Sequence, residues 1–317
     1  MRIQPLIQSS LFDVADWQVD SEFAIFPQGA RAKEAVFAPK APADPVIVGD
    51  KRYLFKRSKR CYPDQFWGEV VAYRIGCLLG VEVPPAFVAY NSRTGHCAAL
   101  IEWFYTDGVE SLIMGGEFLQ QIFPDFDRKH GTHHNVIENT WLMRSLSQQS
   151  LVTDWIQWWV HALLFDALIG NTDRHQDNWG LIFSFFNNKV KCKLTPLFDN
   201  GTSLGHERFP NKVKNWEDID IGQYINNTKA CHHVKWSREI NGPVIKGHFE
   251  LLERALEEWP EMREEIRTKL NFSLDDMSEV VNSLSQINAP EPFSRDRITF
   301  VLRLLAHRYK RLKSLLL

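Results

Sequence analysis

The chain has 317 residues, of which 44% are hydrophobic and 12% aromatic, so it can bury a large core in one domain or in two lobes. Its 37 Lys and Arg against 39 Asp and Glu leave a net charge of -2, which excludes a general attraction to nucleic acid or to an anionic membrane. Five scattered cysteines, the absence of a signal-peptide pattern and the absence of a long apolar stretch predict a cytoplasmic protein, or one exported by a specialised route.

The first third of the chain is predicted to consist mainly of strands. One helix interrupts them from about Asp64 to Leu79, where apolar residues recur at helical spacing, and Gly80 follows as its C-terminal cap. The strands are short β-prone runs separated by Pro, Gly, Asn and Asp, and they cover residues 35–37, 52–55, 86–90 and 98–104.

A loop near the N-terminus is a candidate for contacts with phosphate groups. The segment Phe26–Lys33 lies between two possible strands and contains Gly29, Ala30, Arg31 and Lys33. Its backbone N–H groups and positive side chains would suit a phosphate, whereas a plain turn is the alternative because the segment has a single glycine.

A lysine and a glutamate further along are a candidate ion pair. Lys56 ends the apolar strand Arg52–Lys56, and Glu69 lies on the helix that follows. In phosphotransferases of the kinase type, a strand lysine holds phosphate oxygens and a helix glutamate holds the lysine. Lys51 and Lys59 are alternatives for the lysine, and Glu69 is alternatively an ordinary exposed helix residue.

The end of the last predicted strand lies where strands give way to helices. We expect this point to be a hinge, at which the backbone of Glu102, Trp103 and Phe104 pairs with the edge of an adenine; a core strand is the alternative. The placement rests on the order of the elements alone. It divides the chain into a β-rich N-lobe, residues 1–104, and a helical C-lobe, residues 105–317.

The remainder of the chain is predicted to be mainly helical. Residues 151–169 are apolar on most of their circumference, which indicates a buried central helix. Further helices are expected at residues 243–258, 274–285 and 294–316. A polar loop, Gly170–Gly180, follows the buried helix directly, and polar residues in such a place call for an explanation.

The polar loop is followed by a predicted β-hairpin over residues 181–194, which leads to Asp199. Because a hairpin returns its two ends to nearly the same place, the loop residues Asp173 and Asn178 should lie close to Asp199. In phosphoryl transfer, Asp173 would orient a substrate hydroxyl, while Asn178, five residues later, and Asp199 of an Asp-x-Gly element would hold Mg²⁺ at the phosphates of ATP. His175 is expected to orient Asp173 or the loop backbone. Taken singly, Asp173 fits a helix end and Asp199 fits a turn, but their joint spacing favours chemistry.

With these residues, the chain resembles the HipA-like serine/threonine kinases, in particular the short members that lack the additional N-terminal subdomain of full-length HipA. The likeness covers most of the chain. The motifs that carry it are the Gly29-x-x-x-Lys33 loop, the strand ending in Lys56, the helix with Glu69 leading to Gly80-Val81-Glu82-Val83-Pro84, the loop Asn171-Thr172-Asp173-Arg174-His175-x-x-Asn178, and Leu194-Thr195-Pro196-Leu197-Phe198-Asp199.

The resemblance implies an α+β, two-lobed protein-kinase-like fold and a bacterial serine/threonine protein kinase of toxin or effector type that uses ATP and Mg²⁺. It implies a protein substrate with a Ser or Thr hydroxyl and an antitoxin or other regulatory protein as partner, without direct binding of nucleic acid. HipA autophosphorylates a serine in its phosphate loop, but here no serine immediately precedes Gly29, which leaves Ser21, Thr202 and Ser203 as candidate sites.

Two other functions stay open on the residues alone. The same set of groups would serve a lipid or small-molecule kinase, for which the basic and aromatic residues between Arg208 and Trp216 hint at a docking face. Outside the enzymes, the chain would be a nucleotide-binding pseudokinase that acts by holding a partner. Turnover, rather than nucleotide binding, separates these possibilities.

Overall fold

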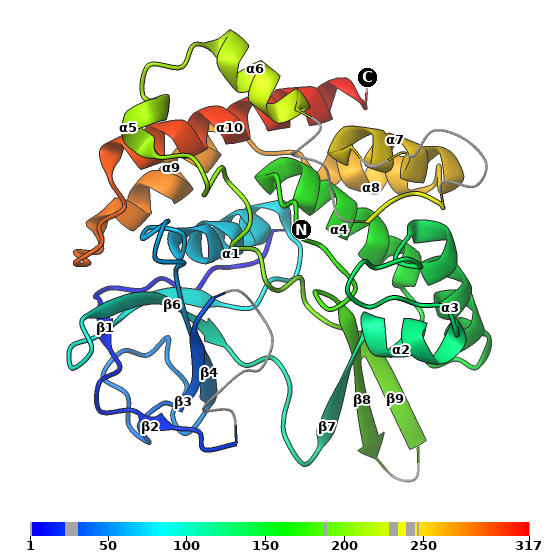
Figure 1. The fold of residues 1–317 in the computed structure, drawn as a ribbon, viewed down its shortest axis with the longest axis horizontal. Coiled ribbons are helices and arrows are strands. Elements are labelled where there is room, and N and C mark those ends of the chain that lie inside the picture. The colour runs from blue at the N-terminus through cyan, green and yellow to red at the C-terminus, as the bar shows by residue number, and fades with distance from the viewer. Residues whose placement is uncertain are drawn as a thin grey trace. The chain divides into compact units, whose positions relative to one another are not determined.

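Residues 2–22, 31–186, 189–227, 234–238, 245 and 247–316 are described by a computed structural model of the chain (Figure 1). The predicted phosphate-loop residues Gly29 and Ala30 lie outside these ranges. The chain divides into two units, which we describe separately. Unit 1 comprises Met1–Trp103, Asn200–Ile219 and Phe272–Ala306, and unit 2 comprises Phe104–Asp199, Asp220–Asn271 and His307–Leu317.

Unit 1 is built on a six-stranded sheet with the strand order β1-β5-β6-β4-β3-β2. Neighbouring strands are antiparallel except for the parallel pair β1 and β5. The four strands predicted from the sequence are confirmed as β3 to β6, whereas β1 and β2 have two residues each and leave no periodic pattern. The strands are β1 Phe12–Asp13, β2 Gln18–Val19, β3 Lys33–Phe37, β4 Arg52–Arg57, β5 Ala86–Asn91 and β6 His96–Glu102.

The main helix of unit 1 is α1, Trp67–Leu79, and all 13 of its residues are buried. Gly80 ends it with φ 72 in the left-handed region, and the Gly80 N–H donates to Cys77 O, so the predicted helix and its cap are confirmed. A helix buried on all sides needs apolar cover in addition to the sheet. Part of this cover comes from late in the chain, because the Trp67 ring stacks on Phe293 with 4.9 Å between ring centroids.

Helices from the last part of the chain therefore belong to the unit of the N-terminal sheet. Helix α9, Leu274–Ser283, packs against α1, and a 3₁₀ helix, Leu284–Gln286, follows it. The short helix α5, Pro210–Val213, also lies in unit 1. The sequence predicts a single boundary after residue 104, whereas the structure separates Trp103 from Phe104 and adds two later segments to unit 1.

Unit 2 is built around α4, Trp155–Ile169, whose side chains are mostly buried. Helices α7, His248–Glu258, and α8, Met262–Lys269, pack against α4. The contacts include Trp155 of α4, whose ring meets Trp259 edge-on at 5.9 Å between centroids. The predicted central helix is thereby confirmed as the core of this unit.

A three-stranded antiparallel sheet of order β7-β8-β9 completes unit 2 (Figure 1). Its strands are β7 Glu110–Met114, β8 Gly180–Phe186 and β9 Lys189–Leu194. Strands β8 and β9 are the predicted hairpin, whereas β7 is not predicted from the sequence. Strand β7 leads straight into α2, Gly115–Ile122.

The remaining helices are α3 Val136–Gln148, α6 Asp218–Asn226 and α10 Arg295–Ser314. The predicted helices at the C-terminal end of the sequence are confirmed as α7, α9 and α10, with boundaries that differ by a few residues. No helix in the described part of the chain is long and apolar enough to cross a membrane.

Candidate active site

The polar loop of unit 2 begins at Gly170, where α4 ends. Gly170 has φ 68, in the left-handed region, and its N–H donates to Asp166 O. A Cβ atom at this position would lie 2.8 Å from the guanidinium of Arg308, so the site requires glycine for its backbone angle and for its space. Arg308 donates to Ala167 O at 3.0 Å and thus completes the last turn of the helix. The chain turns sharply out of a buried helix at this point.

Arg174 is the organising side chain of the loop. Its guanidinium forms a two-pronged ion pair with Asp166 of α4, with Nε to Oδ2 at 2.9 Å and Nη2 to Oδ1 at 2.8 Å, and both side chains are 0% exposed. The third nitrogen, Nη1, donates to Asn178 O at 3.0 Å and to Phe198 O at 2.6 Å. One buried side chain therefore holds the end of the loop next to the residue that precedes Asp199.

Hydrogen bonds within the loop set the positions of the predicted catalytic residues. The carbonyl of Asp173 accepts from Asn178 Nδ2 at 2.6 Å and from the His175 N–H at 2.8 Å. His175 Nδ1 accepts from the Asp177 N–H at 3.1 Å, which puts the proton of a neutral ring on Nε2. Asn178 is buried and uses its amide nitrogen inside the loop, so its Oδ1 is the atom suited to a metal ion. These contacts bring Asp173, His175 and Asn178 together.

Asp199 has a strained backbone. Its φ is 55, in the left-handed region, which residues other than glycine seldom occupy, although Asp and Asn tolerate it better than most. The preceding Phe198 packs against Phe104, with 5.2 Å between ring centroids. The structure thus places Phe104, a predicted adenine-hinge residue, beside the segment that carries Asp199.

In unit 1, the structure brings Lys56 and Glu69 together. Lys56 Nζ lies 2.8 Å from Glu69 Oε1, and both residues are 3% exposed. Glu69 also accepts from Arg31 Nη2 at 2.5 Å and, through Oε2, from the Asn200 N–H at 2.9 Å. A buried carboxylate with two cations and a backbone N–H is well compensated. Because Asn200 directly follows Asp199 in the chain, the same carboxylate holds the peptide after the predicted metal ligand.

Arg31 packs closely against the Asp-x-Gly element. An added Cβ at Gly201 would overlap the Arg31 guanidinium, so a larger residue there would force this side chain to shift. Gln65 Nε2 donates to Gly201 O at 3.0 Å. Lys33 is the first residue of β3 and lies opposite Lys56 in the strand register, so both predicted phosphate-loop cations that the structure describes lie next to the Lys56–Glu69 pair.

The two remaining hinge residues are engaged within unit 1. The Glu102 N–H donates to Pro85 O at 2.8 Å, and its carboxylate forms an ion pair with Lys51. The Trp103 N–H donates to Arg52 O at 3.1 Å, and the Arg52 guanidinium lies 4.9 Å from the centre of the Trp103 ring. Their N–H groups are therefore used by neighbouring strands, and contact with an adenine edge stays a prediction that rests on element order.

The donor set fits magnesium better than a transition metal. The described residues contain no group of three or more His, Cys, Asp or Glu side chains that could hold a metal ion by themselves. Mg²⁺ does not need such a cage, because it is held by one or two carboxylates together with phosphate and water oxygens. Asn178 and Asp199 would supply one amide oxygen and one carboxylate, from two segments that Arg174 holds together.

Sequence reasoning missed the residues that support the loop. Asp166 lies in an otherwise apolar helix, and an ionised group there predicts a buried partner, so the signal was present. His248 of α7 is also buried, and its Nε2 lies 2.6 Å from Asn171 O, where it donates to the carbonyl at the start of the loop. Nothing in the sequence connects His248 with Asn171, which is 77 positions earlier.

The chain is similar to a known protein family and to solved structures. The family model described as the HipA-like C-terminal domain matches residues 26–284. The structure is similar to the crystal structure of CtkA, a proinflammatory kinase of Helicobacter pylori, with 16% identity, a TM-score of 0.69 and 96% of each chain covered. HipA of Shewanella oneidensis MR-1, solved with HipB and operator DNA, is 16% identical with a TM-score of 0.36, over 94% of this chain and 65% of that one.

No curated protein matches the chain in sequence. The likeness to CtkA confirms the α+β kinase-like fold expected from the sequence, since it covers nearly all of both chains. The family match spans most of the chain, including the Lys56 strand, α1, the Asp173 loop and Asp199. The chain belongs to the HipA-like C-terminal domain family.

Proposed function

We propose that the chain is an ATP- and Mg²⁺-dependent serine/threonine protein kinase of the HipA-like type. The observation that supports this most is Arg174, which holds the loop of Asp173 and Asn178 beside the segment that ends in Asp199. Phosphoryl transfer depends mainly on positioning and on compensation of charge, and a buried clamp of this kind provides the positioning.

In the proposed reaction, Asp173 accepts a hydrogen bond from the substrate hydroxyl and takes its proton as the hydroxyl oxygen bonds to the γ-phosphorus. The bond from that phosphorus to the β–γ bridging oxygen breaks, and ADP leaves. Asn178 and Asp199 would hold Mg²⁺, which would supply positive charge to the phosphate oxygens. Lys56, oriented by Glu69, donates to phosphate oxygens. His175 keeps the loop in shape through the N–H of Asp177.

The test is transfer of label from γ-labelled ATP. Purified protein is incubated with Mg²⁺ and the nucleotide, alone and with a cell lysate, beside an Asp199→Ala variant. The matched control is Glu253→Ala, which removes an exposed carboxylate of α7. We expect labelled protein with the wild type and with the control, and none with Asp199→Ala.

Other outcomes would select the alternatives. Label in lipid or in a small molecule, with none in protein, would establish a kinase of another substrate class. ATP binding without transfer to any acceptor would contradict the proposal and favour a pseudokinase.

Autophosphorylation is proposed at Ser21 in preference to Ser203. Ser21 is exposed, whereas Ser203 is buried and its hydroxyl donates to Asn200 O at 2.5 Å. Thr202 is half-buried. A toxin or effector role and an antitoxin-like partner rest on family membership alone and are tested by identifying proteins that co-purify with the tagged chain.

A further inference from the structure

An aromatic and cationic surface lies in unit 1, outside the groups assigned above. The Tyr62 ring contacts the rings of His206 and Phe209, with 5.5 Å and 5.8 Å between centroids. Lys212 Nζ lies 5.5 Å from the centre of the Phe209 ring. The surface therefore joins the loop that precedes α1 to the chain around α5, and we call it the Tyr62–Phe209 surface.

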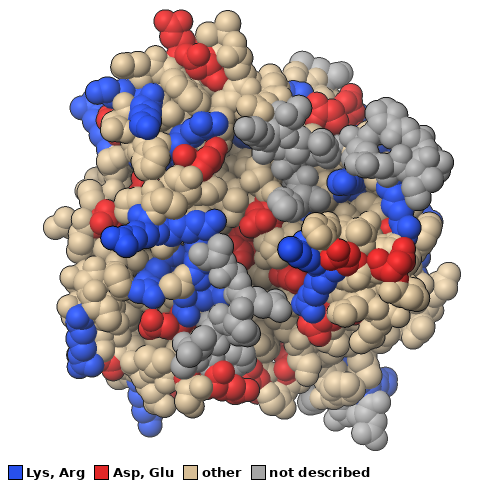
Figure 2. All heavy atoms as spheres, in the orientation of Figure 1, with Lys and Arg blue, Asp and Glu red and all other residues tan. Residues whose placement is uncertain are grey.

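Its side chains are accessible and carry positive charge. Phe209 is 41% exposed, which is high for a large aromatic residue beside cations. Figure 2 shows Lys and Arg side chains gathered on the visible face of unit 1 over α1. Four nearby cations form no ion pair with a described residue; they are Lys59, Arg60, Lys212 and Lys214.

The neighbouring ionisable groups do not cancel this charge. Glu207 lies 3.4 Å from Arg208, and Asp64 is paired with Arg297, so these two carboxylates are already compensated. Burial lowers the pKa of His206 to about 4, so its imidazole is neutral at physiological pH. The net charge of the surface is positive.

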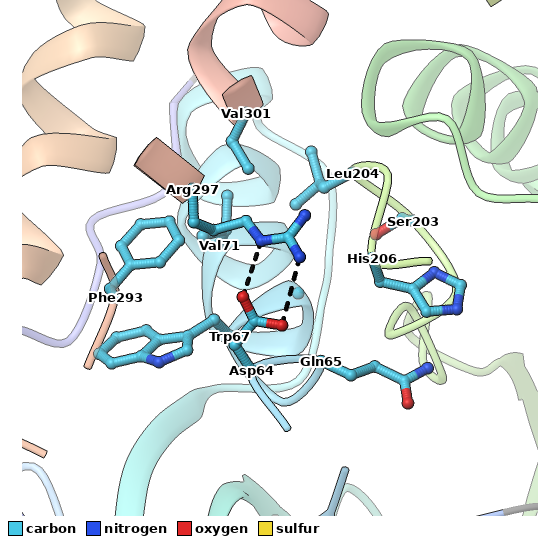
Figure 3. A pocket seen from close by; sticks show the side chains of 11 residues that line it. Asp64, Gln65, Trp67, Val71, Ser203, Leu204, His206, Phe293, Arg297 and Val301 are labelled. Atoms are coloured by element: carbon cyan, nitrogen blue, oxygen red, sulfur yellow. Dashed lines mark hydrogen bonds and ion pairs between the residues drawn. The ribbon is translucent and has the colours of Figure 1, made fainter. Parts of the chain in front are cut away.

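A buried arginine holds the loop that precedes α1 and the chain before α5 in fixed positions (Figure 3). Arg297 of α10 forms an ion pair with Asp64 at 2.8 Å and donates to Gly205 O at 3.0 Å and to Arg208 O at 2.7 Å. Asp64 and Arg297 themselves line a pocket, together with the apolar side chains of Trp67, Val71, Leu204 and Phe293. A surface fixed in this way loses little conformational entropy when a partner binds.

The surface also adjoins the Asp-x-Gly element within unit 1. Gln65 donates to Gly201 O at 3.0 Å, and Tyr62 precedes Gln65 by one turn, with the Gln65 N–H donating to Tyr62 O at 3.0 Å. A chain bound along Tyr62 and Phe209 would therefore pass near Gly201, in the unit that also holds Lys56.

We propose that the Tyr62–Phe209 surface docks an acidic segment of the protein substrate. Carboxylates of that segment meet Lys59, Arg60, Lys212 and Lys214, and an apolar side chain packs on Phe209. The proposal rests on the proposed kinase function. Nucleic acid fits less well, because such footprints commonly neutralise about 6–10 phosphates, whereas this surface has four uncompensated cations bordered by Glu217 and Asp218.

The experiment measures peptide binding without nucleotide. The probe is a short fluorescein-labelled peptide with a central serine, a run of glutamates and one leucine, and its anisotropy is titrated with the full chain. The test variant is Lys212→Glu with Lys214→Glu. The matched control is Lys189→Glu with Lys191→Glu, the same charge change at exposed positions of β9. Circular dichroism verifies that both variants are folded.

We expect the test variant to bind the peptide roughly tenfold or more weakly, since four units of charge are changed opposite an acidic ligand, and the control to bind like the wild type. Phe209→Ala should weaken binding of the leucine peptide and leave a matched alanine peptide unaffected. Added salt should weaken binding to the wild type.

Three results would overturn the proposal: equal losses in test and control variants, equal binding of a peptide with glutamines in place of glutamates, or binding of phosphatidylserine vesicles or of RNA in preference to the peptide. Transfer of label to the peptide is then measured with Mg²⁺ and ATP. Binding without transfer would contradict the kinase proposal and not the docking of an acidic peptide, so the two failures are distinguishable.

Discussion

Each unit contains a buried ion pair at the base of its candidate functional residues, and the two pairs differ in what else their charged groups contact. In unit 2, the guanidinium of Arg174 donates four hydrogen bonds, two to Asp166 and two to backbone carbonyls. In unit 1, the shared group is a carboxylate, Glu69, which holds two cations, Lys56 and Arg31.

This difference in contacts indicates which of the two ion pairs can interact with a ligand. A guanidinium is a rigid fork, so Arg174 fixes the segments that it touches. A lysine is a point charge on a flexible stem, so Lys56 can contact a phosphate while Glu69 keeps it in place. The Arg174 pair therefore positions backbone, whereas the Lys56 pair presents charge. The predictions below test this assignment.

The largest effect should come from Asp199, the proposed metal ligand, which follows the Phe198 carbonyl that Arg174 holds. Asp199→Asn is expected to lower the rate of phosphoryl transfer by at least about 10³-fold, roughly 4 kcal/mol, because a charged ligand of Mg²⁺ is lost. Asparagine tolerates the left-handed backbone at this position, so stability should change little. Initial rates with saturating ATP measure the effect, and a rate within a few-fold of the wild type would refute the role of Asp199.

Arg174→Met should mainly lower the free energy of unfolding. It removes the guanidinium that forms the ion pair with the buried Asp166 carboxylate, which costs about 3 kcal/mol of unfolding free energy. The double variant Asp166→Leu with Arg174→Met should recover part of that stability but not the transfer activity, because the carbonyls of Asn178 and Phe198 are no longer held together. Urea denaturation measures the first effect. An Arg174→Met variant as stable as the wild type would show that the ion pair of Arg174 with Asp166 does not stabilise the fold.

Glu69→Gln should lower the transfer activity more than the stability, which is the opposite of the effect expected at Arg174. We expect transfer to fall by about 10- to 100-fold, because Lys56 loses its charged partner. Unfolding free energy should fall by only about 1–2 kcal/mol, since the amide oxygen still accepts at the Oε1 position, although the Asn200 N–H loses its acceptor. The control is Glu82→Gln at an exposed position. A large loss of stability without loss of transfer would reverse the comparison between the two pairs.

Gly201→Ala should have the smallest effect on transfer. Its methyl group would push Arg31 away from the Asp-x-Gly element, and we expect a loss of roughly several-fold in transfer, about 1 kcal/mol. Gly222→Ala in α6 is the matched control, because an added Cβ there meets nothing within 4 Å. Equal activity of the two variants would show that the packing of Arg31 on Gly201 has no part in transfer.

The sequence by itself determined the elements whose patterns are local. The strand runs, the buried helix α4 and Gly80 after α1 depend on residues a few positions apart, and they are predicted correctly. The same holds for the spacing of Asp173 and Asn178, because both lie in one short loop that a hairpin follows. Strand β7 was missed because its order comes from pairing with β8, some 70 residues later in the chain.

The pairing of charged groups that lie far apart in the sequence is set by the tertiary structure. Arg31 reaches Glu69 across 38 positions, and Asn200 reaches it across 131, and neither contact has a local signature. The assignment of residues 200–219 and 272–306 to the unit of the N-terminal sheet has the same origin, since the fully buried α1 needs apolar cover that only distant segments supply. Local patterns set which elements form, whereas the burial of their apolar faces decides which of them pack together and hence which polar groups face one another.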